Sequence, residues 1–335
     1  MTINMYAVYV KPLLPIHHES LNMNNTSGRS LLDIDKILHV YEDLRPIMPA
    51  HTPGRGHKAE RMRDLLDHFD ALMLDGFGVL NIGKDIIPGA IELLSMAADQ
   101  NKPVLVVTNG ATQNEQMIGQ KYADMGLPVL SPQVVSSRAA VTHWLIHDRP
   151  AEWRRIGVVD HMAADLAVDD VTLIRLDDKN ADGWADCDAI AVMGATMWNE
   201  AWQARLTETA IRGSTLLLAN PDFAAPHPGR FSFEPGYFAW QLITAGATDI
   251  RWFGKPHQTH FDLSMMRLEH ITDNYNWNRK RIAMVGDTLH TDILGGAAAG
   301  LTTVLITGHG LFRDGGADTA MARTGITPDF VVDTI

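Results

Sequence analysis

The chain has 335 residues, of which 46% are apolar and 20% are charged, which is enough length and apolar content for a large core and suggests two domains. Its 28 basic and 40 acidic side chains give a formal charge of −12, which argues against a nucleic-acid or anionic-membrane partner because both bind basic surfaces. The single cysteine, Cys187, excludes an intramolecular disulfide and a cysteine-based zinc cluster. No apolar run approaches the roughly 18 residues of a membrane-spanning helix, so we expect a soluble, cytoplasmic protein.

The first part of the chain is expected to be an N-terminal extension, residues 1–60. Residues 22–30 are rich in Asn, Ser, Thr and Gly, a composition typical of weakly structured segments. Residues 31–44 carry apolar side chains at helical spacing, and residues 46–56 predict a loop. A helix is predicted at residues 60–69, directly before the first buried strand.

From residue 71 onward, short apolar runs alternate with helical patterns. This alternation is typical of an α/β protein with a doubly wound parallel sheet and right-handed crossovers. The middle of the chain keeps the alternation but reads as a separate unit, which ends in a long loop of turn-forming residues. We therefore predict one sheet split in the sequence, with core parts at residues 61–135 and 250–335 and an α/β cap inserted at 136–249. The predicted strands are 71–74, 103–107, 155–159, 173–176, 189–193, 215–218, 250–253, 281–285, 303–307 and 330–332, and the predicted helices are 90–99, 114–125, 137–147, 199–212, 259–272 and 291–299.

Four chemically functional side chains follow or close apolar runs: Asp75, Thr108, Lys255 and Asp287. In a parallel α/β sheet, groups at the carboxyl ends of strands meet at one edge. Two carboxylates can hold a hard cation there, while a hydroxyl, an ammonium group and backbone amides bind phosphoryl oxygens. Gly110 would let the backbone approach an anion closely. Each residue alone also fits a structural role, as a helix cap, a strand end or a surface lysine, but the ordered set predicts a magnesium and phosphate site.

The same segments resemble the four motifs of the haloacid dehalogenase (HAD) superfamily. The inserted unit resembles the C2 cap of its class IIA branch, which includes NagD-like and 4-nitrophenylphosphatase-like sugar phosphatases. The resemblance covers residues 65 to 335. It rests on Asp75-Gly-Phe-Gly-Val, Val-Thr108-Asn109-Gly110, Gly254-Lys255-Pro256, Val-Gly286-Asp287-Thr288-Leu-His-Thr291-Asp292 and, in the cap, Asn220-Pro221-Asp222.

The resemblance implies a Rossmann-like HAD core and a Mg²⁺-dependent phosphatase. Asp75 would be the nucleophile, which forms an aspartyl phosphate that water hydrolyses. Mg²⁺ would be held by Asp75, the backbone carbonyl of Phe77 and Asp287, with Asp292 as a nearby acid.

The same resemblance assigns the phosphoryl group and the leaving group to other residues. Thr108 and the backbone amides of Asn109 and Gly110 would bind the phosphoryl oxygens, and Lys255 would neutralise their charge. The cap loop would select the leaving group; Asp222 also fits a plain turn carboxylate. The implied specificity residues are Asn220 and Asp222.

One position departs from the usual pattern of the superfamily. Its phosphatases usually carry a second Asp two residues after the nucleophile as general acid and base, and here that position is Phe77. Such a group is typically worth about a hundred- to ten-thousand-fold in rate, so alkyl phosphates should be turned over slowly unless another group replaces it. The candidate replacements are His257, His290 and Asp222.

Two functions are therefore open at this stage. The leading hypothesis is a phosphatase for a small phosphorylated metabolite, a sugar or polyol phosphate. The alternative is a catalytically weak or inactive HAD-like protein that binds a phosphometabolite. A receiver-like domain phosphorylated on Asp75 is disfavoured by the large insertion. A homo-oligomer is compatible with either hypothesis.

Overall fold

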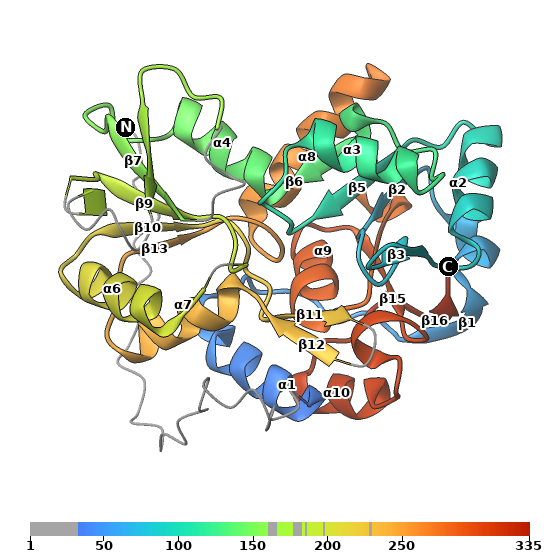
Figure 1. Cartoon of the computed structure of the whole chain (residues 1–335). Coiled ribbons are helices and arrows are strands. Elements are labelled where there is room, and N and C mark those ends of the chain that lie inside the picture. Colours follow the sequence, from blue (N-terminus) through green and yellow to red (C-terminus); the bar gives the residue numbers. More distant parts are fainter. Residues whose placement is uncertain (1–32, 160–165, 177–182, 185, 197, 228–229) are drawn as a thin grey trace.

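The computed structural model describes residues 33–159, 166–176, 183–184, 186–196, 198–227 and 230–335 (Figure 1). The weakly structured segment predicted at residues 22–30 lies outside these ranges. None of the helices in the described ranges is long and apolar enough to cross a membrane. The helices are α1 (Ile34–Asp43), α2 (Ala90–Asp99), α3 (Glu115–Asp124), α4 (Ser137–His147), α6 (Glu200–Ile211), α7 (Pro235–Thr244), α8 (Gln258–Thr272), α9 (Leu294–Ala298) and α10 (Ala317–Thr324).

Seven parallel strands form the larger sheet, in the order β1-β16-β15-β14-β2-β5-β6. From the inner strand β2 the chain builds outward through β5 and β6, and it later returns on the other side of β2 through β14, β15 and β16. A reversal of this kind creates the crevice beyond the carboxyl ends of strands in which α/β proteins bind ligands. The strands are β1 (His57–Arg61), β2 (Ala71–Leu74), β5 (Val104–Thr108), β6 (Val134–Ser136), β14 (Ile282–Gly286), β15 (Thr302–Ile306) and β16 (Phe330–Thr334).

Five parallel strands form the smaller sheet, in the order β13-β10-β9-β7-β8. All of them come from the middle of the chain, so the predicted α/β fold with an inserted cap is confirmed. The predicted end of the cap at residue 249 differs from the sheet, because β13 pairs with β10 although we assigned it to the core. The strands are β7 (Arg155–Val159), β8 (Thr172–Leu176), β9 (Ala189–Val192), β10 (Thr215–Leu218) and β13 (Ile250–Trp252).

Several short elements are not predicted from the sequence pattern. A hairpin follows β2, and a second hairpin occupies part of the loop predicted at residues 219–230. We call residues 219–223, between β10 and this second hairpin, the cap loop. The two hairpins are β3 (Asn81–Ile82) with β4 (Asp85–Ile86), and β11 (Ala224–His227) with β12 (Arg230–Phe233).

The predicted boundary of the N-terminal extension is wrong at its end. Residues 57–61 form β1, which pairs in parallel with β16 at the edge of the larger sheet. The helix predicted at 60–69 is instead the end of β1 followed by the 3₁₀ helix η2 (Met62–His68). β1 is a largely exposed edge strand with charged side chains, so its sequence lacks the alternating apolar residues of a half-buried strand. The hydrophobic pattern therefore does not predict it.

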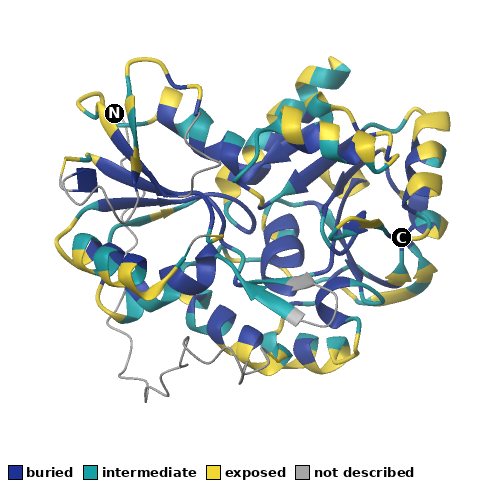
Figure 2. Ribbon diagram, viewed as in Figure 1, coloured by how far each residue is buried: buried dark blue, intermediate teal, exposed yellow. Residues whose placement is uncertain are grey.

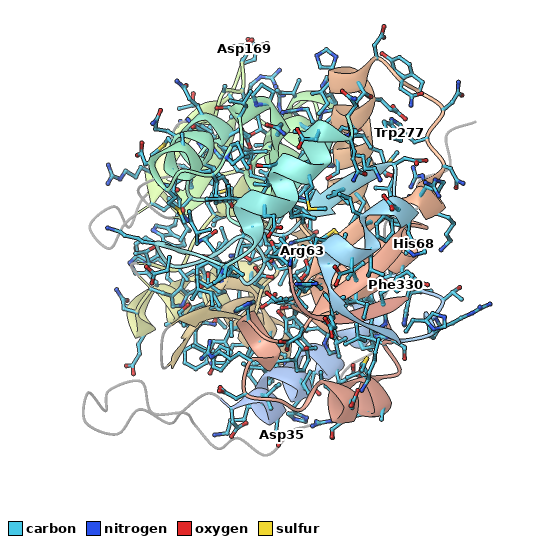
Figure 3. All side chains as sticks on the ribbon, turned by 90° about the vertical axis from the view of Figure 1, so that its right-hand side faces the viewer. Asp35, Arg63, His68, Asp169, Trp277 and Phe330 are labelled. Carbon is cyan, nitrogen blue, oxygen red and sulfur yellow. The ribbon has the colours of Figure 1, made fainter. Side chains whose placement is uncertain are left out.

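Aromatic contacts hold η2 against the sheet. The ring centroids of His68 and Phe69 lie 5.7 and 6.3 Å from that of Phe330 on β16, and Figure 3 shows His68 and Phe330 close together. These contacts anchor the polar edge strand to the core.

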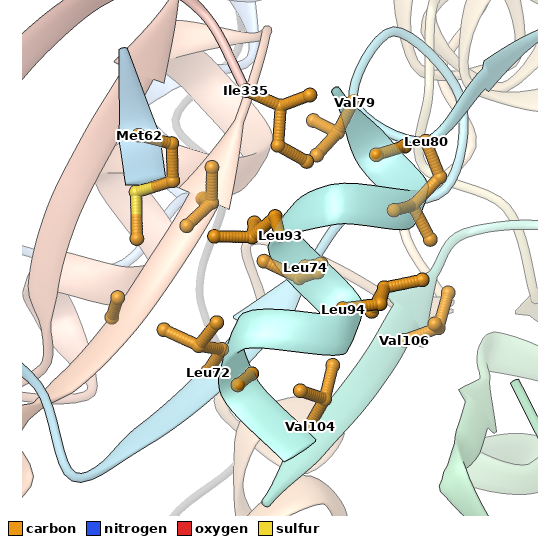
Figure 4. Packing of buried hydrophobic residues seen from close by; sticks show 14 of the residues in the cluster. Met62, Leu72, Leu74, Val79, Leu80, Leu93, Leu94, Val104, Val106 and Ile335 are labelled. Carbon is orange, nitrogen blue, oxygen red and sulfur yellow. The ribbon is translucent and has the colours of Figure 1, made fainter. Parts of the chain in front are cut away.

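Strand β2, which ends directly before Asp75, is buried on both faces (Figure 2). One face packs against α2, as Figure 4 shows, and the other packs in a cluster with α8. Burial of a whole strand between two helical layers fixes the position of the residue that follows it. The side chains in contact on the α2 side include Leu72, Leu74, Leu93, Leu94, Val104 and Val106.

Candidate active site

The structure brings four predicted site residues together beyond the carboxyl ends of β2 and β14. The ammonium group of Lys255 lies 2.7 Å from Asp75 Oδ1 and 2.7 Å from Asp292 Oδ1. One carboxylate oxygen from each of Asp75, Asp287 and Asp292 lies within 4.8 Å of the others. We call these three acids the carboxylate cluster. Residues that are about two hundred positions apart in the sequence therefore lie around one set of charged groups.

The cluster carries more negative than positive charge. Burial raises the pKa of Asp75 to about 7, although Lys255 opposes the shift. Burial, followed by repulsion from Asp292 and Asp75, raises the pKa of Asp287 to about 8. Burial lowers the pKa of Lys255, but the carboxylates of Asp292, Asp75 and Asp222 outweigh it and raise it above the ordinary value. The excess of buried carboxylate favours a bound cation.

Backbone and hydroxyl groups orient the two acids that follow β14. Asp287 Oδ2 accepts a hydrogen bond from the amide of Leu311 (2.8 Å), and its Oδ1 accepts one from the Thr288 hydroxyl (3.0 Å). Asp292 Oδ2 accepts from the amide of Thr288 (3.1 Å). A Cβ on Gly310 would lie 1.8 Å from Asp287 Oδ2, so only glycine fits there. The donor set is therefore preformed: hard oxygens, held in place, which suit a hard divalent metal ion.

Lys255 reaches the cluster from a different direction than the strand pattern predicts. We expected it at the end of a strand of the same sheet, but the preceding strand β13 belongs to the smaller sheet. The chain crosses back to the core through Gly254, whose φ is +98°, and through the cis Lys255–Pro256 peptide. A Cβ at Gly254 would lie 2.7 Å from Asn109 Oδ1. The return crossing from cap to core thus supplies the lysine.

The side chain of Asn109 connects three segments of the site. Its Oδ1 accepts a hydrogen bond from the Lys255 amide (2.7 Å), and its Nδ2 donates to the Lys255 carbonyl (3.1 Å) and to Asp222 Oδ1 (2.8 Å). The Ser137 hydroxyl donates to the Asn109 carbonyl (2.7 Å). From the sequence we expected only the backbone amide of Asn109 to act. The position of Asn109 directly after a strand does not indicate which groups its side-chain amide will bind.

Thr108 and Gly110, the other predicted phosphate ligands, lie in the same turn after β5. The Gly110 amide donates to Thr108 Oγ1 at 3.1 Å. Thr108 is half-buried and Gly110 is exposed, so both are accessible at the edge of the sheet.

The cap loop carries Asp222 to the core. Asn220 Oδ1 accepts from the Asp222 amide (2.9 Å), while its Nδ2 donates to Glu234 (3.3 Å), so Asn220 shapes the turn. Asp222 itself contacts Asn109, and burial raises its pKa to about 7. Asp222 is thus within reach of the site by way of Asn109.

The two histidines proposed as replacement acids are engaged elsewhere. His257 stacks on Trp252 with ring centroids 5.6 Å apart, and burial lowers its pKa to about 4. His290 Nε2 lies 2.6 Å from Glu42 Oε1, and its ring stacks on that of Tyr41 at 4.7 Å. Of the three candidates, Asp222 has the contacts that suit the role.

Comparison with known proteins finds relatives along most of the chain. A model of haloacid dehalogenase-like hydrolases matches residues 72–165, and a second model, HAD-hydrolase-like, matches residues 252–335. The chain is 29% identical to human chronophin over 287 residues, which cover 82% of this chain and 93% of that protein. It is 24% identical to the acid sugar phosphatase of Staphylococcus epidermidis over 253 residues, which cover 74% of this chain and 91% of that protein.

A solved structure shares the architecture of most of the chain. It is a possible sugar phosphatase of the HAD superfamily from Cytophaga hutchinsonii, and it superposes with a TM-score of 0.72 at 24% identity, covering 83% of this chain and 98% of that one. The matched models cover the strands of the larger sheet other than β1, and the resemblance seen in the four motifs is confirmed. The chain belongs to the haloacid dehalogenase-like hydrolases, in their capped class IIA phosphatase branch.

Proposed function

We propose that the protein is a Mg²⁺-dependent phosphomonoesterase that hydrolyses small phosphorylated metabolites of the sugar or polyol class. The observation that supports this proposal is the contact of Lys255 with Asp75 beside the carboxylate cluster, because phosphoryl transfer to an aspartate needs a carboxylate, a positive charge and further acids for a metal close together. The names of two relatives, acid sugar phosphatase and possible sugar phosphatase, support the substrate class.

The reaction uses Asp75 as the nucleophile. Its carboxylate attacks phosphorus, the ester P–O bond breaks, and the alcohol leaves with a proton; water then attacks the aspartyl phosphate and releases phosphate. Lys255, 2.7 Å from Asp75, favours the ionised nucleophile and neutralises the transferred group. Asp75, Asp287, Asp292 and the Phe77 carbonyl would hold Mg²⁺, which would supply further positive charge to the phosphoryl oxygens.

Thr108 and the amides of Asn109 and Gly110 bind the phosphoryl oxygens at the end of β5. Asn109 additionally holds Lys255 and Asp222 in register with this turn. The cap loop then meets the leaving group. Because Phe77 cannot transfer a proton, Asp222 is the group that protonates the leaving oxygen in this proposal, and its raised pKa of about 7 suits that task.

The choice of leaving group tests this proposal. We expect faster turnover of 4-nitrophenyl phosphate than of glycerol phosphate, because a nitrophenolate leaves without a proton, whereas the glycerol oxygen has to take its proton from Asp222 alone, since Phe77 supplies none. Phe77→Asp should raise the rate on glycerol phosphate by about a hundredfold and change the rate on the aryl ester far less. Phe77→Leu is the matched control, and it should leave the ratio of the two rates unchanged. Equal wild-type rates on both esters would contradict the assigned role of Phe77.

Magnesium should stabilise the fold, and more strongly at alkaline pH. The pKa of Asp287 is about 8 and that of Asp75 about 7 in the folded chain, against about 4 in an unfolded one. Between these values the folded state binds more protons, so metal-free stability falls as the pH rises from about 4 to about 8. Magnesium binds the ionised carboxylates and offsets this loss.

Thermal unfolding with Mg²⁺ or with EDTA measures the effect. A metal concentration of about a hundred times Kd should add about 2.7 kcal/mol at about pH 8, and less at about pH 5. Asp287→Asn should remove most of this gain, whereas the exposed Asp85→Asn should keep it. A gain that is the same at both pH values would argue against a metal at these acids.

A further inference from the structure

We propose that helix α1 is a positioning element of the active site, which holds the cap loop in place through the hydroxyl of Tyr41. The inference rests on the proposed phosphatase function. Helix α1 precedes both segments matched by the family models, residues 72–165 and 252–335, so it lies outside the matched segments.

Helix α1 packs between the cap and the core. Asp33 caps its N-terminus by accepting a hydrogen bond from the Lys36 amide (2.9 Å). Figure 1 shows the helix below α7 and beside α10, and Asp35 pairs with Arg323 of α10 at 3.2 Å. Its buried face joins one apolar cluster with residues of both units. These include Ile37, Leu38, Val40 and Tyr41 of α1, Phe223, Tyr237 and Phe238 of the cap, and Leu289, Ile293 and Leu294 of the core.

Tyr41 contacts the backbone of the cap loop directly. The amide of Phe223 donates to the Tyr41 hydroxyl at 3.0 Å, and the two rings lie 5.9 Å apart. Only 2% of Tyr41 is exposed, so its hydroxyl is a buried, fixed acceptor. Burial, and then the nearby carboxylate of Asp222, raise the pKa of the phenol, which stays neutral. The contact fixes the peptide that directly follows Asp222.

The next two residues of α1 extend the connection. Glu42 Oε1 lies 2.6 Å from Nε2 of His290, on the turn that carries Asp292. Asp43 Oδ2 accepts a hydrogen bond from the Trp240 indole of α7 at 3.1 Å. Consecutive residues of one helix therefore contact the cap loop, the turn of the carboxylate cluster and a cap helix.

Asp222 is consequently held from two sides. Its carboxylate is bound by Asn109 at 2.8 Å, and its following peptide is bound by Tyr41. Loss of the Tyr41 hydroxyl would leave the Phe223 amide without its acceptor and let the cap loop shift. Because Asp222 faces the leaving group in the proposed function, a shifted cap loop should slow the turnover of esters with poor leaving groups. It should have little effect on esters whose leaving group needs no proton.

The test compares Tyr41→Phe with Tyr237→Phe in the full chain. Tyr237 is the matched control: it is 2% exposed, belongs to the same apolar cluster, and its hydroxyl accepts from Gln241 of its own helix at 3.1 Å. Hydrogen–deuterium exchange of the segment that contains Phe223 reads the contact without any need for activity. We expect at least about tenfold faster exchange in Tyr41→Phe and no change in Tyr237→Phe.

Steady-state kinetics then measures the effect of the Tyr41 contact on turnover. Tyr41→Phe should lower kcat/KM for glycerol phosphate by about tenfold and keep kcat/KM for 4-nitrophenyl phosphate within about twofold of the wild-type value. The reason is that the lost hydrogen bond affects only the cap loop. In an Asp222→Asn background the same substitution should add little, because Tyr41 acts through Asp222. If the losses of kcat/KM caused by Tyr41→Phe and by Asp222→Asn were fully additive, the proposal would be overturned.

The outcomes separate this inference from the proposed function. Unchanged exchange at Phe223 in Tyr41→Phe, or an equal change in Tyr237→Phe, would overturn the role of α1 even in an active phosphatase. Absent turnover of every ester by the wild-type chain would overturn the proposed function, while the exchange experiment would still decide whether α1 holds the loop.

Discussion

Asp75→Asn is expected to lower the rate of phosphate release by about ten-thousand-fold or more, because an amide cannot act as the nucleophile. The substitution keeps the shape of the side chain. Lys255 keeps its second partner, Asp292, at 2.7 Å, so the site should not collapse. The variant should also be at least as stable as the wild-type chain in the absence of metal, since burial raises the pKa of Asp75 and the ionised carboxylate is costly there. Lost activity with retained stability marks a residue of the reaction rather than of the fold.

This experiment also decides between an enzyme and a binding protein. Phosphate release from 4-nitrophenyl phosphate is measured for the wild-type chain, for Asp75→Asn and for Asp85→Asn, an exposed control in the following hairpin. An enzyme requires release by the wild-type and control chains and loss in Asp75→Asn. Release that persists in Asp75→Asn would contradict the proposed nucleophile. No release by any of the three, combined with binding of BeF₃⁻, would favour the phosphometabolite-binding alternative.

Lys255→Met is expected to lower both activity and stability. The Lys255 side chain is 2% exposed, and its ammonium group lies 2.7 Å from each of two carboxylates, so its removal leaves buried negative charges unpaired. Breaking a buried ion pair of this kind costs about 3–5 kcal/mol. The loss of charge at the transferring phosphoryl group should lower turnover by a further hundred- to thousand-fold, roughly the effect of removing one preorganised charge donor. Methionine keeps much of the volume of lysine, so the effect reports charge rather than packing.

Denaturant unfolding with EDTA, at several pH values, measures the stability effect. The cost should be largest at about pH 8 and small at about pH 5, where the acids with raised pKa values are protonated in the folded state. Magnesium should recover part of the loss because it supplies positive charge to the same acids. Lys84→Ala, at an exposed position in the hairpin turn after β2, is the control and should change neither quantity. A loss of stability independent of pH would mean that packing, not charge, explains the effect.

Local sequence predicted much of the fold because several of the strands are fully buried. β2, β9 and β10 are short apolar runs between turn formers, a pattern typical of buried strands of parallel sheets. Helix α7 was missed, since its many aromatic residues and its position after a Pro- and Gly-rich segment resemble a continuing loop. The edge strand β1 was missed because its stability comes from pairing with β16, at the other end of the chain.

The candidate site was predictable in its residues but not in all its connections. Asp75 and Asp287 follow central strands, and a parallel sheet must bring such positions to one edge. Lys255 follows a strand of the other sheet, so its place in the site depends on how the chain crosses between the two units. From the sequence, Lys255 was included because it follows an apolar run, and the family resemblance placed it in the same site.

By itself the sequence determined the α/β alternation, the inserted unit, and the acids, hydroxyl and lysine that the motifs contain, because periodicity and turn residues act over a few neighbouring positions. Only the tertiary structure decided that Asn109 binds both Lys255 and Asp222, and that Tyr41 of an N-terminal helix contacts the amide of Phe223. Those contacts join residues 113 to 182 positions apart, and hydrogen bonds over such separations depend on the packing of whole layers, which no local pattern specifies.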